Sequence, residues 1–160
     1  MIRSKRSYTT FSERAMKRSE FAAWCRSGVH LLDGAAGSNF MRAGMPRGVC
    51  AEQWVLEHPQ VAQTLIGQYA AAGSEIVYAP TFCANRRALG DFGLADRLHQ
   101  MNLALVRLAR EAAGADVLVA GDMTTLGRPV EEEGAHSYDA LLKLYREQAE
   151  ALSEAGVDLF

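Results

Sequence analysis

The sequence predicts an α/β fold built on parallel strands, and three observations lead to this class. Short apolar segments of strand length alternate with longer segments of helical periodicity. Glycine or proline stands at most boundaries between them. Two expected strands end in a polar turn, Asp33-Gly34 and Gly121-Asp122. Strand–helix alternation predicts right-handed crossovers between parallel strands, which leaves two closures open: a doubly wound sheet or a (β/α)8 barrel.

The first expected elements surround the Asp33-Gly34 turn. A helix over 20–26 is expected to bury an apolar side formed by Phe21, Ala22, Trp24 and Cys25. The apolar segment Val29–Asp33 is expected to be a short buried strand. A glycine-rich loop follows it, and then a short helix over 38–42. Because neither a GxGxxG motif nor a P-loop follows this strand, the commonest nucleotide sites of a doubly wound sheet are excluded.

The remaining elements repeat the strand–helix unit. Pro59 predicts the first turn of a helix that reaches Gly73. The further strands are expected over 75–79, 116–120 and 157–160, the last being only a beginning. The further helices are expected over 84–89, 94–113 and 138–155. The longest of these helices has one apolar face, formed by Leu98, Met101, Leu105, Leu108 and Ala112.

Composition and charge exclude several classes of protein. The 160 residues provide for one domain with a hydrophobic core, and a formal net charge of −2 favours neither nucleic acid nor an anionic membrane as a partner. The longest apolar runs have strand length, so no segment is expected to span a membrane. Three widely spaced cysteines without a CxxC pair support neither a disulfide framework nor a local zinc site. We therefore expect the protein to be cytoplasmic, in a reducing environment.

The chain divides into a basic N-terminal tail, residues 1–18, and one domain over residues 19–160. The tail contains six Lys or Arg residues and one Glu, among several Ser and Thr. Such a start also resembles an organelle transit peptide, whereas the lack of an apolar segment behind it argues against a secretory signal. We interpret it as a solvated tail that leads into the first helix.

Asp33 is the first candidate for a functional residue, because it stands where an apolar strand ends. The carboxyl ends of parallel strands are where ligands bind in α/β folds. The glycines that follow, Gly34 and Gly37, let the backbone turn sharply and let a ligand approach main-chain N–H groups. By itself, the motif is more typical of an aspartate in a tight turn or at a helix N-terminus.

Four blocks of sequence together resemble one known family. The blocks are LLDGAAGS at 31–38, EHPQV at 57–61, APTFCANR at 79–86, and YREQ through AGVDLF within 145–160. In this order and spacing they are similar to the homocysteine S-methyltransferase family, from about Phe21 to the last residue. That family includes the zinc- and homocysteine-binding module of cobalamin-dependent methionine synthase, and betaine–homocysteine methyltransferase.

The resemblance implies a (β/α)8 barrel of the TIM type, of which this chain would hold the N-terminal half with the first four strands. It also implies an S-methyltransferase that transfers a methyl group to the thiol of homocysteine to give methionine. Zinc binds the thiolate in this family, which favours deprotonation and orients the sulfur for attack. The implied donor is methylcobalamin, methylfolate acting through a corrinoid, a betaine or a sulfonium compound. A corrinoid protein or domain is therefore an expected partner.

The first strand end matches the family's positions for the amino-acid part of homocysteine. The resemblance implies that Asp33 holds the ammonium group through a charge-assisted hydrogen bond. The N–H groups of Gly34 and Ala35 would take the substrate carboxylate. Many relatives have a second glycine where this chain has Ala35, a change that leaves the backbone donor in place.

The next two strand ends supply the other matched positions. The resemblance implies that Thr81, Phe82 and Asn85 line the substrate pocket after the second strand. Asp122 follows the third strand, where relatives often also carry a polar residue. The resemblance assigns no catalytic residue to this chain.

The family's zinc ligands have no counterpart in these 160 residues. They are a cysteine after the sixth strand and a cysteine pair after the eighth, so no metal ligand is assigned here and the isolated chain is expected to be inactive. A barrel needs roughly 250 residues. The chain is therefore expected to be a fragment, to pair with a second half-barrel chain, or to self-associate as a homo-oligomer. Inner-face residues of the strands would then lack half their packing: Leu31, Val77, Val119 and Leu159.

Two other functions remain open from the sequence. The half-barrel would also suit a non-catalytic module that binds a partner chain or a homocysteine-like amino acid without turnover. The same fold also occurs in corrinoid-linked methyltransferases that act on another acceptor. Zinc content and homocysteine binding distinguish these alternatives from the homocysteine methyltransferase.

Overall fold

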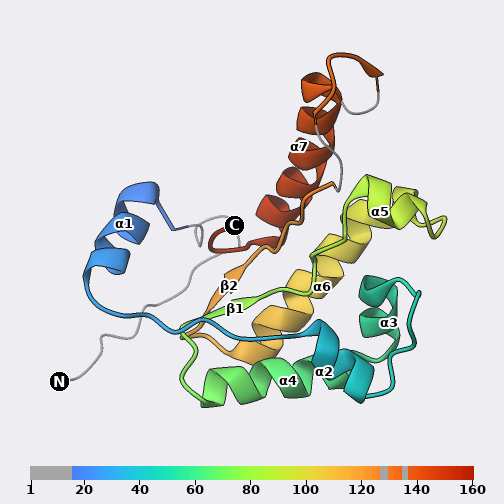
Figure 1. Ribbon diagram of the computed structural model, residues 1–160. Helices are drawn as coiled ribbons and strands as arrows, with labels where there is room; N and C mark the ends of the chain where they lie inside the picture. The colour runs from blue at the N-terminus through green and yellow to red at the C-terminus, as the bar shows by residue number, and fades with distance from the viewer. Residues whose placement is uncertain (1–15, 127–129, 135–136) are drawn as a thin grey trace.

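The computed structural model describes residues 16–126, 130–134 and 137–160, and shows a small parallel sheet packed against helices (Figure 1). The strands are β1 (Ile76–Tyr78) and β2 (Leu118–Ala120). The helices are α1 (Arg18–Arg26), α2 (Gly37–Arg42), α3 (Ala51–Glu57), α4 (Pro59–Ala71), α5 (Arg86–Gly90), the 3-10 turn η2 (Ala95–Arg97), α6 (Leu98–Ala113) and α7 (Tyr138–Ala155). Most of the expected tail, residues 1–15, and two parts of the loop before α7, 127–129 and 135–136, lie outside the described residues.

The sheet segments lie side by side in the order of the sequence. β1 pairs with β2 in parallel, and parallel bridges add Leu32 beside β1 and Leu159 beside β2. Helices α4, α6 and α7 lie on one side of these strands (Figure 1). A doubly wound sheet has helices on both faces, whereas a barrel wall has sequential strands and helices on one side only. The arrangement therefore favours the barrel wall, although the described residues form an open sheet and no closed barrel.

The outermost segments of the sheet are shorter than predicted, and the first is also more exposed. Leu32 and Leu159 each make a single bridge, to Ile76 and Ala120, in place of a full strand. The expectation that the first segment is buried is wrong, since Val29 is 91% exposed and Leu32 is 47% exposed. An apolar run predicts a buried strand only where a second layer covers it, and the described residues provide no such layer here.

The two inner strands are better packed than the sequence suggests. Val77 and Val119 lie opposite each other in the register and are fully buried, so the expectation that they lack half their packing is wrong. Side chains alternate between the two faces of a strand, and this pair points toward the helices. Tyr78, the next residue, is 38% exposed. Val77 and Val119 thus do not face the open side of the sheet, whereas Leu31, from the same predicted set, is 55% exposed.

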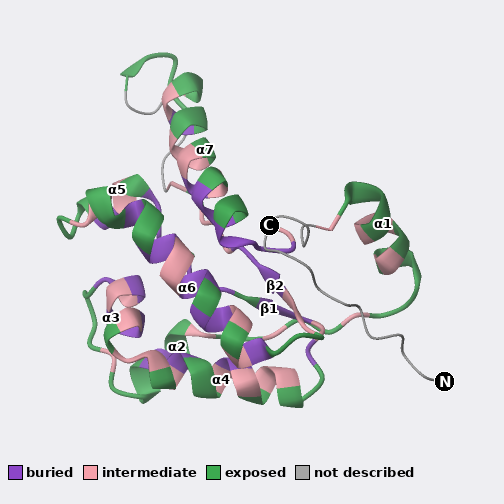
Figure 2. Ribbon diagram, turned by 180° about the vertical axis from the view of Figure 1, so that it is seen from behind, coloured by how far each residue is buried: buried purple, intermediate pink, exposed green. Residues whose placement is uncertain are grey.

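One hydrophobic cluster joins the sheet to α4, α6 and α7. The two buried valines pack against residues of these helices: Ala62, Ile66, Leu105, Ala109 and Leu152. Full burial of a Val, Leu or Ile side chain stabilises the fold by about 1.5–3 kcal/mol. Figure 2 shows buried positions along the strands and along α6 and α7, while α1 has none. Among the described residues, no helix is both long enough and apolar enough to cross a membrane.

Two helices differ from the sequence-based expectation. Helix α3 is not predicted, because its seven residues are too few to show a period. It ends at Glu57, and His58 separates it from Pro59, the first residue of α4. Helix α1 has no buried residue, so its expected inward packing is wrong. Trp24 instead stacks on His30, with ring centroids 3.5 Å apart.

A buried ion pair fastens the last segment of the chain to the sheet and to α6. Asp158 is 7% exposed and binds the guanidinium of Arg110. The same carboxylate accepts the N–H of Val119 at 2.8 Å. Arg110 also donates to the carbonyl oxygens of Val117 and Gly156. The pair therefore fixes the Leu159 bridge against β2.

We expect Asp158→Asn to lower the free energy of unfolding by about 3 kcal/mol, because it leaves the buried guanidinium of Arg110 without its counter-ion. The more exposed pair of Arg86 and Glu147 provides the control, since Glu147→Gln is expected to cost less than about 1 kcal/mol. Urea unfolding followed by circular dichroism measures both losses. Equal losses would contradict the assignment of the buried pair as an anchor.

Candidate functional site

The predicted site residues gather at the carboxyl ends of the strands. Asp33 follows the first bridge, Thr81 follows β1 and Asp122 follows β2. The turns after β1 and β2 are joined by a main-chain hydrogen bond from Thr124 N–H to the Phe82 carbonyl, at 3.2 Å. Residues that are far apart in the sequence thus become neighbours at one edge of the sheet.

Asp33 is half-buried and only partly satisfied. Its Oδ2 accepts the N–H of Tyr78 at 3.0 Å, while its Oδ1 is buried without a hydrogen-bond partner among the described residues. Burial raises the pKa of this carboxyl, the Tyr78 N–H opposes the rise, and the charge of Asp122 adds to it. Because an unpaired buried oxygen costs about 1–3 kcal/mol, a cation or a proton at Oδ1 would be favourable.

Gly34 and Ala35 form an exposed turn beside Asp33. Tyr69 of α4 donates its hydroxyl to the Ala35 carbonyl at 3.1 Å. A Cβ at Gly34 would lie only 2.9 Å from the same hydroxyl, so a side chain here would displace the end of Tyr69. Within the described part of the chain, no hydrogen bond leads from the N–H of Gly34 or Ala35. Both donors are therefore available to a ligand.

Thr81 is fully buried, and its side chain binds the neighbouring turn. Its hydroxyl donates to the Asp122 carbonyl at 2.9 Å and accepts the Asp122 N–H at 3.0 Å. Its carbonyl accepts the side chain of Gln148, from α7, at 2.8 Å. Thr81 therefore positions Asp122, which is half-buried.

Phe82 and Asn85 lie on the same turn but differ in exposure. Phe82 is 52% exposed, whereas Asn85 is 3% exposed. The Oδ1 of Asn85 accepts the N–H of Ala88 at 2.9 Å, so this side chain caps the N-terminus of α5. Asn85 also lines a cavity of about 240 Å³ together with Cys83 and Thr124.

Three buried polar side chains that were not predicted as site residues hold the turn after β1. Glu52, on α3, accepts the N–H of Cys83 at 2.7 Å. Asn102, on α6, donates to the Ala84 carbonyl at 2.8 Å. Gln148 is the third, through its bond to the turn described above. Each is at most 4% exposed. Three helices therefore supply the partners that the backbone of this turn lacks.

Only two of these three residues leave a signal in the sequence. Asn102 stands one turn after Leu98, next to the apolar face of α6, where a polar residue needs a buried partner. Gln148 belongs to one of the four blocks that resemble the family. Glu52 leaves none, because its helix shows no periodicity.

Negative charge concentrates around this turn. Burial raises the pKa of Asp122, and the charge of Glu52 adds to the rise. Burial also raises the pKa of the Cys83 thiol to about 11, with further contributions from Glu52, Cys50 and Asp122. A thiol with a raised pKa is protonated near neutral pH, whereas metal ligands and nucleophiles are thiolates.

The described residues do not fit a zinc site. They contain no group of three or more His, Cys, Asp or Glu side chains placed to hold a metal ion. Cys25 is exposed, while Cys50 is buried and Cys83 partly buried. A catalytic zinc ion takes three protein ligands, which these thiols do not provide.

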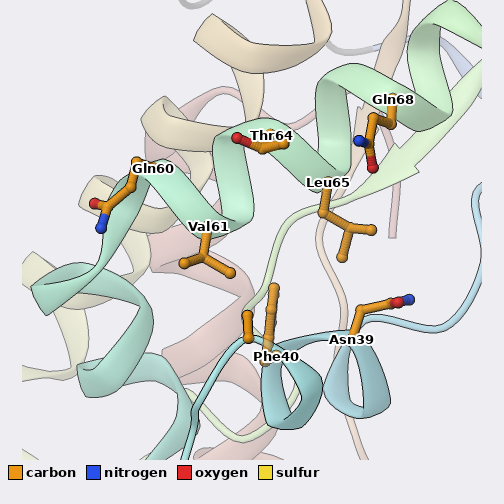
Figure 3. Close-up of a pocket in the computed structure, with 8 residues that line it drawn as sticks. Asn39, Phe40, Gln60, Val61, Thr64, Leu65 and Gln68 are labelled. Atoms are coloured by element: carbon orange, nitrogen blue, oxygen red, sulfur yellow. The ribbon is translucent and has the colours of Figure 1, made fainter.

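A second cavity, of about 340 Å³, lies between α2 and α4 and contains none of the predicted site residues. Figure 3 shows Val61 and Leu65 of α4 pointing toward Phe40 of α2. The polar side chains around it are amides and one hydroxyl: Asn39, Gln60, Thr64 and Gln68. Because no lining side chain is titratable, the groove offers no side-chain acid or base.

The fold is similar to that of proteins of known structure. Two solved structures with a similar fold are crystal structures of the homocysteine methyltransferase MmuM from Escherichia coli. The metallated form matches with a TM-score of 0.71 and 25% identity over 86% of this chain. The oxidized form matches with a TM-score of 0.69 and 23% identity over 87%. In both cases the match covers 55% of the other chain, so this chain spans about half the length of these relatives.

The sequence match to a family extends further along this chain than any single motif. The family described as homocysteine S-methyltransferase matches residues 30–160, which include Asp33, the turn after β1 and Asp122. The match thus covers most of the chain and all the residues predicted to bind substrate. The protein belongs to the homocysteine S-methyltransferase family.

Proposed function

We propose that this chain forms the amino-acid-binding half of a homocysteine S-methyltransferase, which transfers a methyl group to the thiol of homocysteine to give methionine. Membership of the family supports the reaction. The observation that carries the role of this half is the buried, unpaired Oδ1 of Asp33. A protonated amino group at this oxygen would form a charge-assisted hydrogen bond and remove the cost of the unpaired atom.

In this proposal, the amino acid is held at both of its charged groups. Asp33 binds the ammonium, and the free N–H groups of Gly34 and Ala35 bind the carboxylate. The charge of Asp122 adds to the attraction for a positively charged group. Phe82, half-exposed at the same edge, contacts the aliphatic part of the substrate.

Thr81 and Asn85 act in this proposal through the backbone. Their side chains are engaged with Asp122 and with α5, so neither is free to bind substrate directly. They hold the turn that presents Phe82. The role implied by the resemblance thus becomes one of positioning for these two residues.

We infer that the other half of a (β/α)8 barrel, including the zinc ligands and the site of the methyl donor, is supplied outside these 160 residues. The matched part is 55% of the solved relatives, and one of these was solved in a metallated form. Large apolar side chains are exposed on the open sheet, with Leu31 at 55% and Phe160 at 60%. A second half-barrel packed there would bury them. The isolated chain is therefore proposed to bind the amino acid without turnover.

We expect Asp33→Asn to weaken the binding of homocysteine by about tenfold or more, because it removes a charged partner of the ammonium. Isothermal titration of the chain with homocysteine measures the effect. The deaminated analogue 4-mercaptobutanoate is expected to bind the chain and the Asp33→Asn variant equally weakly.

Asp116→Asn serves as the matched control, since Asp116 is exposed near the opposite end of β2. Its affinity for homocysteine should equal that of the unchanged chain. If Asp33→Asn and Asp116→Asn bind homocysteine equally, or if the chain takes up no homocysteine at millimolar concentration, the proposed role of Asp33 is wrong.

The raised pKa values also predict how stability changes with pH. Because the folded state binds protons at Asp33 and Asp122 more tightly than the unfolded chain, each carboxylate lowers stability at neutral pH. We expect Asp33→Asn and Asp122→Asn each to raise the free energy of unfolding at neutral pH by about 0.5–1 kcal/mol. The gain should fade as the pH falls toward 3.8, the value of an unperturbed aspartate. Urea unfolding across this range measures it, and a loss at neutral pH would contradict the assignment.

A further inference from the structure

Glu52 is the most buried carboxylate of the site and has no cationic partner. It is 4% exposed. Its Oε1 accepts the Cys83 N–H at 2.7 Å, and its Oε2 lies 3.6 Å from the Sγ of Cys50. Among the ion pairs of the described residues, none includes Glu52. A charge held in this way is costly, because burial removes it from water without a counter-ion.

The hydrogen bond alone does not explain a carboxylate at this position. A glutamine would accept the same N–H without the cost of desolvating a charge, but it has one acceptor oxygen, whereas the Oε2 of Glu52 also accepts the Cys50 thiol at 3.6 Å. Elsewhere in the same turn, the neutral amides of Asn102 and Gln148 donate to the carbonyls of Ala84 and Thr81. The negative charge of Glu52 also adds to the rise in the pKa values of Asp122 and Cys83.

We propose that Glu52 is a positioning residue of the substrate site, which holds the turn that carries Thr81, Phe82 and Asn85 through its hydrogen bond to the Cys83 N–H. It acts through the backbone of Cys83, and it does not touch the substrate. This inference rests on the proposed function in one respect, that the substrate is an amino acid with a free ammonium group. Its test uses only Cys83, so either proposal can fail while the other stands.

The first measurement is amide hydrogen exchange at Cys83, followed by nuclear magnetic resonance in the full chain. Glu52→Ala removes the acceptor and is expected to speed exchange of this amide by about tenfold or more. Glu52→Gln keeps an oxygen acceptor and is expected to retain the protection. Unchanged exchange in Glu52→Ala would overturn the positioning role.

The second measurement isolates the charge, through the pH dependence of alkylation of the Cys83 thiol. It uses a chain in which Cys25 and Cys50 are replaced by serine, so that a single thiol reacts. The groups that raise the pKa of this thiol, besides burial, are Glu52, Cys50 and Asp122, of which Glu52 and Asp122 remain in this chain. Glu52→Gln is expected to raise the alkylation rate in mildly alkaline solution by about 3–10-fold, since more of the thiol is ionised.

Two controls keep the result interpretable. Glu57→Gln, an exposed carboxylate on the same helix, should change neither exchange nor alkylation. Circular dichroism checks that each variant is folded, and Glu52→Gln carries the test if Glu52→Ala does not fold. An alkylation profile that is the same in Glu52→Gln and in the unchanged chain would overturn the role of the charge. Loss of homocysteine binding at Asp33 would leave both Cys83 measurements as they are.

Discussion

The turn after β1 has backbone groups that no strand or helix pairs, and side chains from three helices satisfy them. Gln148 of α7 donates to the carbonyl of Thr81, and Glu52 of α3 accepts the N–H of Cys83. Asn102 of α6 donates to the carbonyl of Ala84. A buried backbone group without a partner costs about 1–3 kcal/mol, so these contacts decide whether the turn keeps one conformation. The turn then fixes Asp122 through the hydroxyl of Thr81. The site therefore depends on how the helices pack behind the sheet.

The same edge of the sheet holds carboxylates in an environment that opposes their charge. Burial raises the pKa values of Asp33 and Asp122. The charge of Asp122 adds to the rise at Asp33, and the charge of Glu52 adds to the rise at Asp122. Carboxylates that repel one another in a partly buried site lower the stability of the ligand-free protein. Such perturbed pKa values are typical of functional sites. A cationic group bound among them would offset the repulsion. The ammonium group of the amino acid proposed to bind here is such a group.

Periodicity made the long helices predictable. The helices predicted over 59–73, 94–113 and 138–155 occur as α4, as η2 with α6, and as α7. The position of Asp33 and Asp122 at one edge was also predictable, because parallel strands end on the same side. Helix α3 was not, because seven residues show no period, and Glu52 was lost with it. The inward use of Asn85 as a helix cap depends on packing that no sequence pattern records.

Because the sheet is open, the described residues enclose only one side of the site. Relatives of about twice this length share the fold, and here the outer segments are single bridges with exposed apolar side chains. The described residues thus form one wall of the amino-acid pocket proposed here, built on buried polar contacts. The central proposal is that the ammonium group of the substrate binds at Asp33.

A crystal structure of the chain with bound homocysteine tests that claim most directly. The account predicts the amino nitrogen at about 2.7–2.9 Å from the Oδ1 of Asp33, the distance of a charge-assisted hydrogen bond. Homocysteine bound elsewhere, for example in the groove between α2 and α4, with Oδ1 still unpaired, would contradict it.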